Sequence, residues 1–294
     1  MDLNHLAVNL LAIGILSRER CGLSKCVTRY LVAMAAADLL TIIIDMILRH
    51  IPIVYKEQFQ FLKYSIPLCN IHAVLLCAAT DCSVRFTITF TFDRFVAICC
   101  QKLRSKYCSE KTATVVLGTV TVLSALKNIF WYFMLTAGDV RSSRIWGTIE
   151  FLHYILTPGV AFVLILLLNA LTVRYILVSS QGRRRLRAHS SGESRRDPEM
   201  KSRRKSIILL LAISANFMLL WAVFMVYLIW WRMWWFGYMS VTLPKFLREL
   251  GFMLQLLSFC TNTVIYAVTQ IQFRQQLKNV LKYPCTQLTK FIQS

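Results

Sequence analysis

Long apolar runs, separated by short polar segments, make up most of the chain. The run at 69–100 is the most informative, because it exceeds the roughly 20 residues that a helix needs to cross a bilayer. Asp93 and Arg94 stand side by side near its end, just before a basic segment that begins at Lys102. An acid and a base where apolar residues give way to bases predict the membrane–cytosol boundary.

Five further runs predict membrane-spanning helices, and a shorter run precedes them. The spanning helices are expected at 27–48, 111–134, 149–178, 207–230 and 244–269. The run at 6–16 is too short to span, and we interpret it as the inner half of a first helix whose outer half is missing from this sequence. The predicted fold is therefore an all-α membrane protein, a bundle of seven transmembrane helices.

Two other segments complete the predicted organisation. Residues 181–205 are polar and basic, and predict a disordered cytoplasmic third loop that becomes helical as the sixth span begins. Residues 1–270 form the seven-helix domain, and 271–294 form a short amphipathic eighth helix and a cytoplasmic tail. The eighth helix is expected to lie on the membrane surface. Its apolar side consists of Ile271, Phe273, Leu277, Val280 and Leu281.

The distribution of Lys and Arg predicts the orientation of the bundle. The loops after the first, third and fifth helices and the C-terminal tail are basic, whereas the other loops carry fewer bases mixed with acids. Because basic loops stay in the cytoplasm, the N terminus is expected outside and the C terminus inside. The predicted location is the plasma membrane, which the chain crosses several times.

Composition and charge exclude several other classes of protein. The chain is 56% hydrophobic and 16% charged, against about 45–50% and 25% for soluble domains. Its net charge of +20 lies between apolar runs and not on one helix face, so nucleic acid is not an expected partner. The five histidines are scattered, and neither a nucleophile–base pairing nor a glycine-rich phosphate loop is present, so no enzyme is predicted.

Several landmarks recur in an order that resembles a known family, the rhodopsin-like (class A) G-protein coupled receptors. They are Asn9, Asp38, Cys69, TFDRF at 91–95, Pro158, Phe217 with Trp221, TNTVIY at 261–266, and Phe273 with Arg274. Within that family, SKCVTRYLVAMAAADLL, LLCAATDCSV, FDRFVAICCQKL and LNALTVRYILV resemble the orphan group around G-protein coupled receptors 139 and 142. The resemblance implies an extracellular ligand, a heterotrimeric G protein and the lipid bilayer as partners.

The resemblance assigns a signalling role to Asp93, Arg94 and Tyr266. In the family, the matching arginine is held by its neighbouring acid when inactive, and contacts the G protein once the sixth helix swings outward. Tyr266 would then close over the opened cavity. Two solvated charges at headgroup level are the alternative for Asp93 and Arg94. The resemblance also implies that Pro158, Phe217, Trp221 and Asn262 form the conformational switch.

An acid near the start of the sixth helix holds that helix shut in many family members. This chain has Arg203 eighteen residues before Trp221, followed by Arg204. Because like charges would then face Arg94, that lock is expected to be absent and basal signalling to be raised.

Asp38, Ser83 and Asn262 match the family's sodium pocket. Oxygen ligands suit a hard cation, and an acid inside a membrane is expected to be functional. The alternative is a hydrogen-bonded polar core without an ion. Sodium is the one cofactor that the sequence suggests.

Polar residues in the outer half of the third and fourth helices predict part of a ligand pocket. Asp81 and Arg85 are four residues apart with the acid first, the favourable order for an intrahelical ion pair; Asp81 could instead contact the ligand. Lys127 could attract an acidic ligand group or extend towards an interface. Leu76 stands where receptors for biogenic amines carry an aspartate, so a biogenic amine is not the expected ligand. The aromatic cluster at 230–235 could admit a peptide or an amino-acid-like small molecule, and an aromatic belt at the membrane interface is the alternative. The expected pocket residues are Leu76, Thr80, Asp81, Lys127 and Trp221.

The chain departs from the family pattern at several positions. Thr263 and Val223 replace prolines of the seventh and sixth helices, and the loop at 135–148 has no cysteine to pair with Cys69. These departures leave open a second interpretation, a non-signalling receptor-derived protein that acts as a decoy or a dimerisation partner.

Overall fold

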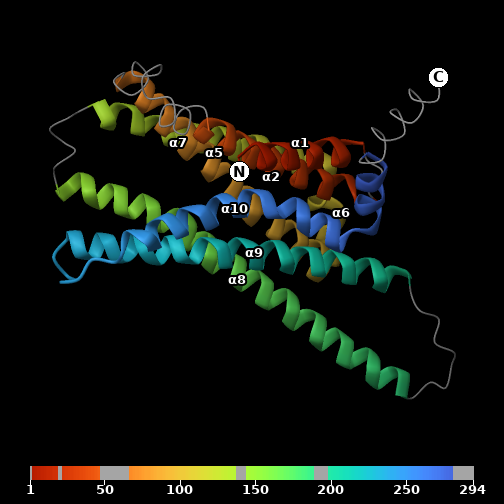
Figure 1. Cartoon of the computed structure of the whole chain (residues 1–294). Coiled ribbons are helices and arrows are strands. Elements are labelled where there is room, and N and C mark those ends of the chain that lie inside the picture. Colours follow the sequence, from red (N-terminus) through yellow and green to blue (C-terminus); the bar gives the residue numbers. More distant parts are fainter. Residues whose placement is uncertain (1, 19–21, 47–65, 137–143, 189–197, 281–294) are drawn as a thin grey trace, which may run out of the picture.

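The computed structural model describes residues 2–18, 22–46, 66–136, 144–188 and 198–280, and the regular elements of these segments are helices (Figure 1). The predicted all-α fold is confirmed. In chain order the helices are α1 (Asp2–Ser17), α2 (Lys25–Asp45), α5 (Ile66–Cys99), α6 (Gln101–Tyr107), α7 (Glu110–Thr136), α8 (Arg144–Ala188), α9 (Pro198–Trp235) and α10 (Lys245–Thr269). Apart from the short α6, they correspond one to one with the seven predicted helices.

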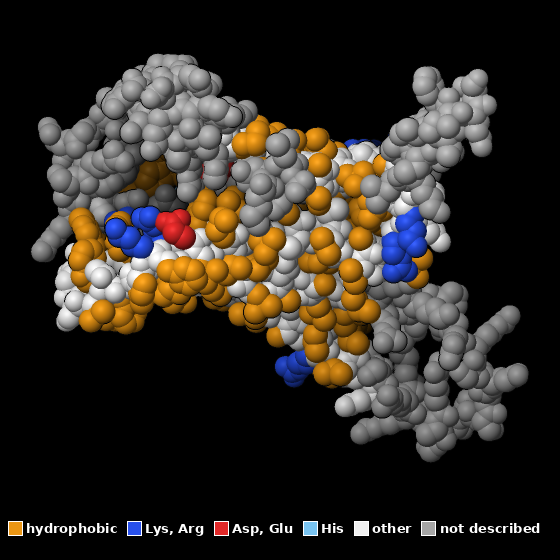
Figure 2. Space-filling view, in the orientation of Figure 1, with side chains coloured by type: hydrophobic (Ala, Val, Ile, Leu, Met, Phe, Trp, Pro, Cys, Tyr) orange, Lys and Arg blue, Asp and Glu red, His pale blue; other side chains and the backbone are white. Residues whose placement is uncertain are grey.

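Length and hydropathy make six of these helices able to cross a membrane, namely α2, α5, α7, α8, α9 and α10. The apolar part of α1, Leu6–Ser17, is shorter. Large apolar side chains remain exposed along the helices, and Figure 2 shows hydrophobic side chains spread over the visible face of the bundle. An apolar exterior of this extent suits contact with lipid.

Helix α5 lies at the centre of the packing, with contacts to α2, α7, α8 and α9. Two buried clusters surround it. One joins α1, α2, α5, α7, α9 and α10 around Leu31, Phe90 and Tyr266. The other joins α2, α5, α8, α9 and α10 around Ile165, Phe217 and Trp221. Every site described below includes α5 or a helix packed against it.

The third loop is shorter than predicted. Helix α8 continues through Ala188, so residues 181–188 are helical where a disordered loop was predicted. Helix α9 begins at Pro198, which agrees with the expected return to helix before the sixth span. Arg and Leu have high helix propensity, and extending an existing helix by one residue is much easier than nucleating a new one. In Figure 1 the C-terminal part of α8 diverges from the other helices. Residues 189–197 lie outside the described residues.

The predicted eighth helix is confirmed. Part of its apolar side packs against the helix bundle, whereas the sequence predicted that this side lies on the membrane surface. Residues 271–280 are helical, after a break at Gln270. Phe273 is fully buried and its ring packs edge-on against Tyr266, with centroids 5.9 Å apart. Leu277 and Val280 pack against the same core, whereas Ile271 is exposed. The helix is therefore anchored to the bundle through Phe273. Leu281 lies outside the described residues.

A glycine allows the closest approach between α9 and α10. A Cβ atom on Gly251 would lie 2.8 Å from Cα of Phe224, well inside van der Waals contact. The obstacle is backbone, which cannot rotate away. By contrast, a Cβ atom on Gly118 of α7 would meet no atom within 4 Å.

We therefore expect Gly251→Ala to separate α9 from α10 and to lower the free energy of unfolding by about 1–3 kcal/mol. The matched control, Gly118→Ala, adds the same methyl group in open space and is expected to leave stability unchanged or slightly raised. Thermal unfolding of both purified variants in detergent checks this. Equal melting temperatures for the two variants would contradict the packing described.

Candidate functional site

One end of α5 carries a buried ion pair. Oδ2 of Asp93 accepts a hydrogen bond from Nε of Arg94 at 3.0 Å and a second one from Nη2. Both residues are less than one-tenth exposed. This burial does not fit the alternative of two solvated charges at headgroup level.

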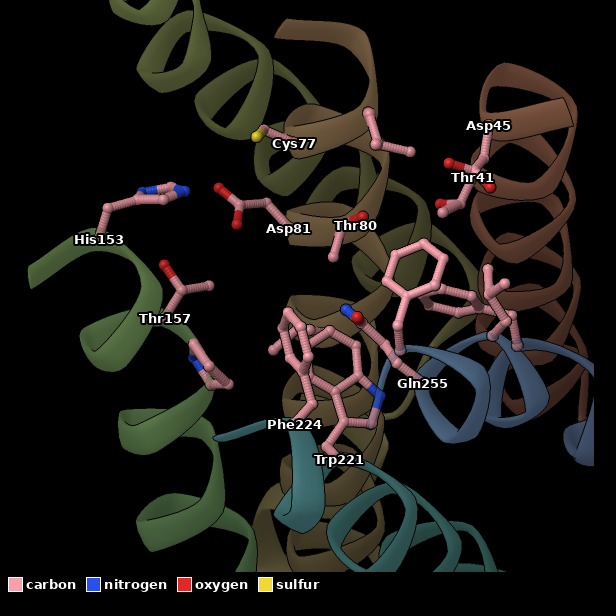
Figure 3. Close-up of a pocket in the computed structure, with 16 residues that line it drawn as sticks. Thr41, Asp45, Cys77, Thr80, Asp81, His153, Thr157, Trp221, Phe224 and Gln255 are labelled. Carbon is pink, nitrogen blue, oxygen red and sulfur yellow. The ribbon is translucent and has the colours of Figure 1, made fainter. Parts of the chain in front are cut away.

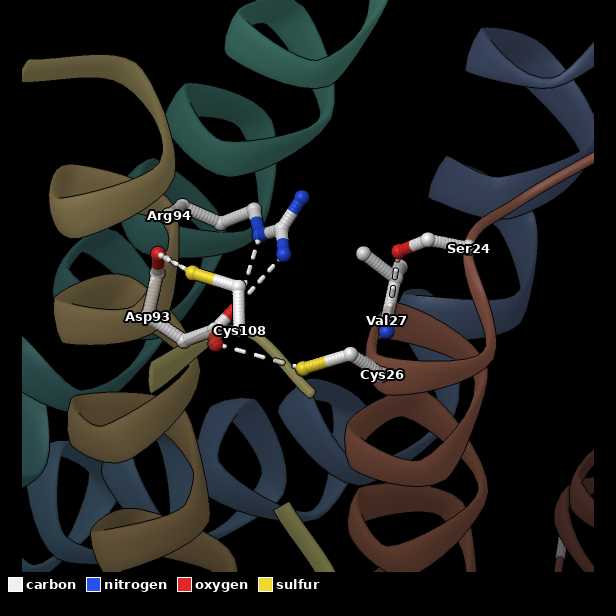
Figure 4. A network of polar contacts seen from close by, with 6 residues as sticks. All are labelled: Ser24, Cys26, Val27, Asp93, Arg94 and Cys108. Carbon is white, nitrogen blue, oxygen red and sulfur yellow. Dashed lines mark hydrogen bonds and ion pairs between the residues drawn. The ribbon is translucent and has the colours of Figure 1, made fainter. Parts of the chain in front are cut away.

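Two cysteines complete the surroundings of Asp93 (Figure 4). The Cys26 thiol, from the first turn of α2, donates to Oδ1 of Asp93 at 3.2 Å. The Cys108 thiol, from the segment between α6 and α7, donates to the backbone oxygen of Asp93 at 3.5 Å. No sequence pattern indicates either contact, because cysteines near apolar runs behave as small hydrophobic residues.

Tyr266 lies inside the bundle near the same end of the core. It is fully buried, and its hydroxyl has no hydrogen-bond partner among the described residues. In many family members an acid near the start of the sixth helix, here α9, holds that helix shut. The side chains of 201–206, including Arg203 and Arg204, lie outside the described residues. The predicted absence of an acid lock therefore stays a prediction.

The middle of the bundle brings the predicted sodium residues together. Both oxygens of Asp38 accept hydrogen bonds, one from Ser83 Oγ at 2.5 Å and one from Asn262 Nδ2 at 3.0 Å. All three side chains are buried. Nearby, Asn9 of α1 donates to the carbonyl of Phe259 in α10 at 3.0 Å. The arrangement joins α2, α5 and α10 through one carboxylate.

A cavity of about 180 Å³ opens in the other half of the bundle, between α2, α5, α8, α9 and α10 (Figure 3). Four of the predicted pocket residues line it, Leu76, Thr80, Asp81 and Trp221, whereas Lys127 does not. Lining residues that sequence reasoning missed are Thr41, Asp45, Cys77, Val84, His153, Thr157, Phe224, Phe252, Gln255, Leu256 and Phe259. They come from several helices, so no local pattern identifies them.

Aromatic rings connect the cavity to the core below it. Trp221 lines the cavity and its ring lies 5.2 Å from that of Phe217 and 6.1 Å from that of Phe259, centroid to centroid. Phe162 of α8 packs edge-on against Phe217 at 5.4 Å. Pro158, one turn before Phe162, lies inside α8 and also lines the cavity. Of the predicted switch residues, Pro158 and Trp221 therefore line the same cavity, and Phe217 packs against Trp221.

Comparison with known families decides the class of the protein. The model of the 7 transmembrane receptor (rhodopsin family) matches residues 8–266, most of the chain. The chain belongs to this family. Its members are signalling receptors and not enzymes, which confirms both the expected class and the expected absence of enzymatic function.

The predicted ion pair between Asp81 and Arg85 of the receptor is wrong. Oδ2 of Asp81 accepts hydrogen bonds from Lys127 Nζ at 2.8 Å and Asn128 Nδ2 at 2.9 Å. Arg85 instead donates to Ser124 Oγ at 3.1 Å. The i,i+4 rule considers one helix alone, whereas α7 packs along α5 and presents a lysine, an amide and a hydroxyl to it.

Lys127 also serves a purpose that neither sequence alternative described. Its ammonium group donates to Thr157 Oγ1 at 3.1 Å as well as to Asp81, and so links α7, α5 and α8. Its side chain is 34% exposed, against 4% for Asp81. The acid is therefore the buried partner, and it depends on Lys127 and Asn128 for compensation.

We expect Asp81→Asn to lower the free energy of unfolding of the receptor by about 2–3 kcal/mol, because it leaves the ammonium of Lys127 without its carboxylate. Adding Lys127→Met should recover most of the loss, since the uncompensated charge is then removed. Arg85→Leu serves as the control, because the Asp81 contacts do not include it. Melting temperatures and double-mutant cycles check this. A stronger coupling of Asp81 to Arg85 than to Lys127 would contradict the contacts described.

Proposed function

We propose that the receptor transmits the binding of an extracellular ligand to a heterotrimeric G protein through outward movement of α9. The observation that carries the proposal is the buried Asp93–Arg94 pair at the end of α5. A charged pair at the end of α5 is inexpensive to hydrate once outward movement of α9 opens that end of the bundle. Hydration then frees the Arg94 guanidinium to contact the G protein. Ligand binding would bias an equilibrium between closed and open arrangements that already exists.

The same proposal fixes the orientation in the membrane. The end of the bundle with Arg94 faces the cytoplasm, the cavity faces outside, and the C-terminal tail lies inside. The basic loops support this arrangement, because bases remain on the cytoplasmic side of a membrane. The basic third loop would also favour anionic inner-leaflet lipid, by about 1 kcal/mol for each base near the surface. The plasma membrane is the proposed location.

The cavity favours a compact ligand. A volume of about 180 Å³ is close to that of cavities that accept a single aromatic ring. Aromatic walls at Trp221, Phe224 and Phe252 surround a few polar groups, among them Thr80 and Gln255. An amino-acid-like small molecule, or one side chain of a peptide, suits these dimensions.

A second candidate function is a non-signalling partner or decoy that dimerises with another receptor. Two departures favour it, because α9 and α10 carry Val223 and Thr263 where most family members have a proline. The intact Asp93–Arg94 pair and the buried Tyr266 oppose it. Signalling measurements separate the two candidates.

We expect cells that express the receptor to show ligand-independent G-protein activation, and Arg94→Ala at matched surface level to abolish it. Arg248→Ala, which removes an exposed arginine near the start of α10, is the matched control and should signal as the wild type does. If the wild type is well displayed on the surface and its signal equals that of empty vector, the prediction of raised basal signalling is wrong. If no class of G protein is activated even with a ligand bound, the result favours the decoy.

We also propose that Asp38, Ser83 and Asn262 hold a sodium ion in the closed receptor. The group offers a buried carboxylate and a hydroxyl, the oxygen ligands that hard cations prefer. A direct hydrogen-bonded core, with no ion, remains the alternative.

Replacing choline chloride by sodium chloride at constant ionic strength should raise the melting temperature of the purified receptor, because an ion that binds the folded state stabilises it. Asp38→Asn should abolish this difference between the two salts. Asp45→Asn, a change to another buried acid of α2, should preserve it. The same sodium effect in wild type and Asp38→Asn would rule the site out.

A further inference from the structure

Asp93 is held from three directions, each by a different part of the chain (Figure 4). Its Oδ2 atom bonds to Arg94, the next residue in α5. Its Oδ1 atom accepts from Cys26 of α2, and its backbone oxygen accepts from Cys108. The carboxylate is thus shared between the arginine proposed to contact the G protein and a thiol of a neighbouring helix.

Local structure fixes the position of the Cys26 thiol. Ser24 caps α2, and its hydroxyl accepts a hydrogen bond from the backbone amide of Val27 at 3.4 Å. This cap sets the first turn of α2, so that Cys26 and Tyr30 both face inwards and are buried. A buried thiol in a capped first turn has little freedom to turn away from Asp93.

An ion pair brings the segments with the two cysteines together. Arg29 of α2 donates twice to Oε1 of Glu110, at 2.7 and 3.1 Å, and Lys25 lies 3.9 Å from Oε2. Glu110 begins α7, two residues after Cys108. The pair is exposed to solvent and adds little to stability, but it joins the start of α7 to α2 beside Asp93.

Both thiols are in the chemical form that donates. Burial first, and then the negative charge of Asp93, raises the pKa of Cys108 to about 11, so that its thiol is protonated at neutral pH. Cys26 lies against the carboxylate itself. A thiol is a weaker hydrogen-bond donor than a hydroxyl, so the two cysteines hold Asp93 with modest strength.

We propose that Cys26 and Cys108 are positioning residues that hold Asp93 in the orientation in which it retains Arg94. The proposal rests on the coupling role proposed above for Arg94. Cys26 acts on the carboxylate and Cys108 on the backbone carbonyl at longer range, so Cys26 has the larger effect. When Cys26 is lost, Oδ1 loses a donor, Asp93 is held less firmly and Arg94 is released more often.

The first test compares ligand-independent signalling at matched surface level. Cys26→Ala should raise the signal about two- to ten-fold, the range expected for one lost hydrogen bond. Cys26→Ser, which keeps a donor, should return the signal to the wild-type level or below it. Cys108→Ala should raise it less than Cys26→Ala does.

The matched control is Cys82→Ala, which removes a buried thiol of α5 about 16 Å along the helix from Asp93. It should leave the signal per surface receptor unchanged. If Cys26→Ala leaves the signal unchanged or lowers it, or if Cys82→Ala raises it equally, the positioning role is overturned.

The second test does not depend on signalling. The infrared difference between wild type and Cys26→Ala, in purified receptor, isolates the S–H stretching band of Cys26. This band should lie at lower frequency than the Cys82 band obtained in the same way, because the Cys26 thiol donates to a carboxylate. A Cys26 band at the same or higher frequency overturns the proposal. If the wild type does not signal but its Cys26 band lies at lower frequency than its Cys82 band, the result overturns only the coupling role proposed for Arg94, and the contact between Cys26 and Asp93 stands.

Discussion

Polar side chains at membrane depth need a partner inside the protein, and among the described helices α5 carries the largest number of buried ones. Along its length, Asp81 bonds to α7, Ser83 to α2, Arg85 to α7, and Asp93 to α2. Each of these contacts fixes the rotation of α5 relative to a neighbour. Because an unpartnered charge in hydrocarbon is expensive, this series of contacts determines the packing more strictly than the apolar surfaces can.

The same series of contacts places the functional parts at different depths of one helix. The cavity lies beside Asp81, the Asp38 group beside Ser83, and the Arg94 pair at the far end. Between the cavity and the lower core stand Trp221 and Phe217, in contact with α8 and α10. A displacement at the cavity therefore reaches Phe217, Phe162 and Phe259 through direct ring contacts.

Much of the fold was predictable, because apolar runs longer than a bilayer leave few alternatives to spanning helices. The Asp38 group was predictable only through family resemblance, since its members are far apart in sequence. The Asp81–Lys127 pair could not be predicted, because it depends on how α7 is rotated against α5, which periodicity within one helix does not report. The Cys26–Asp93 contact depends likewise on the packing of α2 on α5, and a thiol carries no distinctive sequence signal.

Helix α9 runs from Pro198 to Trp235 without an internal proline, over a length of about 57 Å. Asn216 accepts a hydrogen bond from Thr261 of α10 at 2.8 Å, near the middle of this length. Proline is the commonest cause of a kink inside a helix, and α9 has none beyond its first residue. In the movement proposed above, α9 would therefore tilt as one stiff rod and not bend at a hinge, so that its two ends would move together.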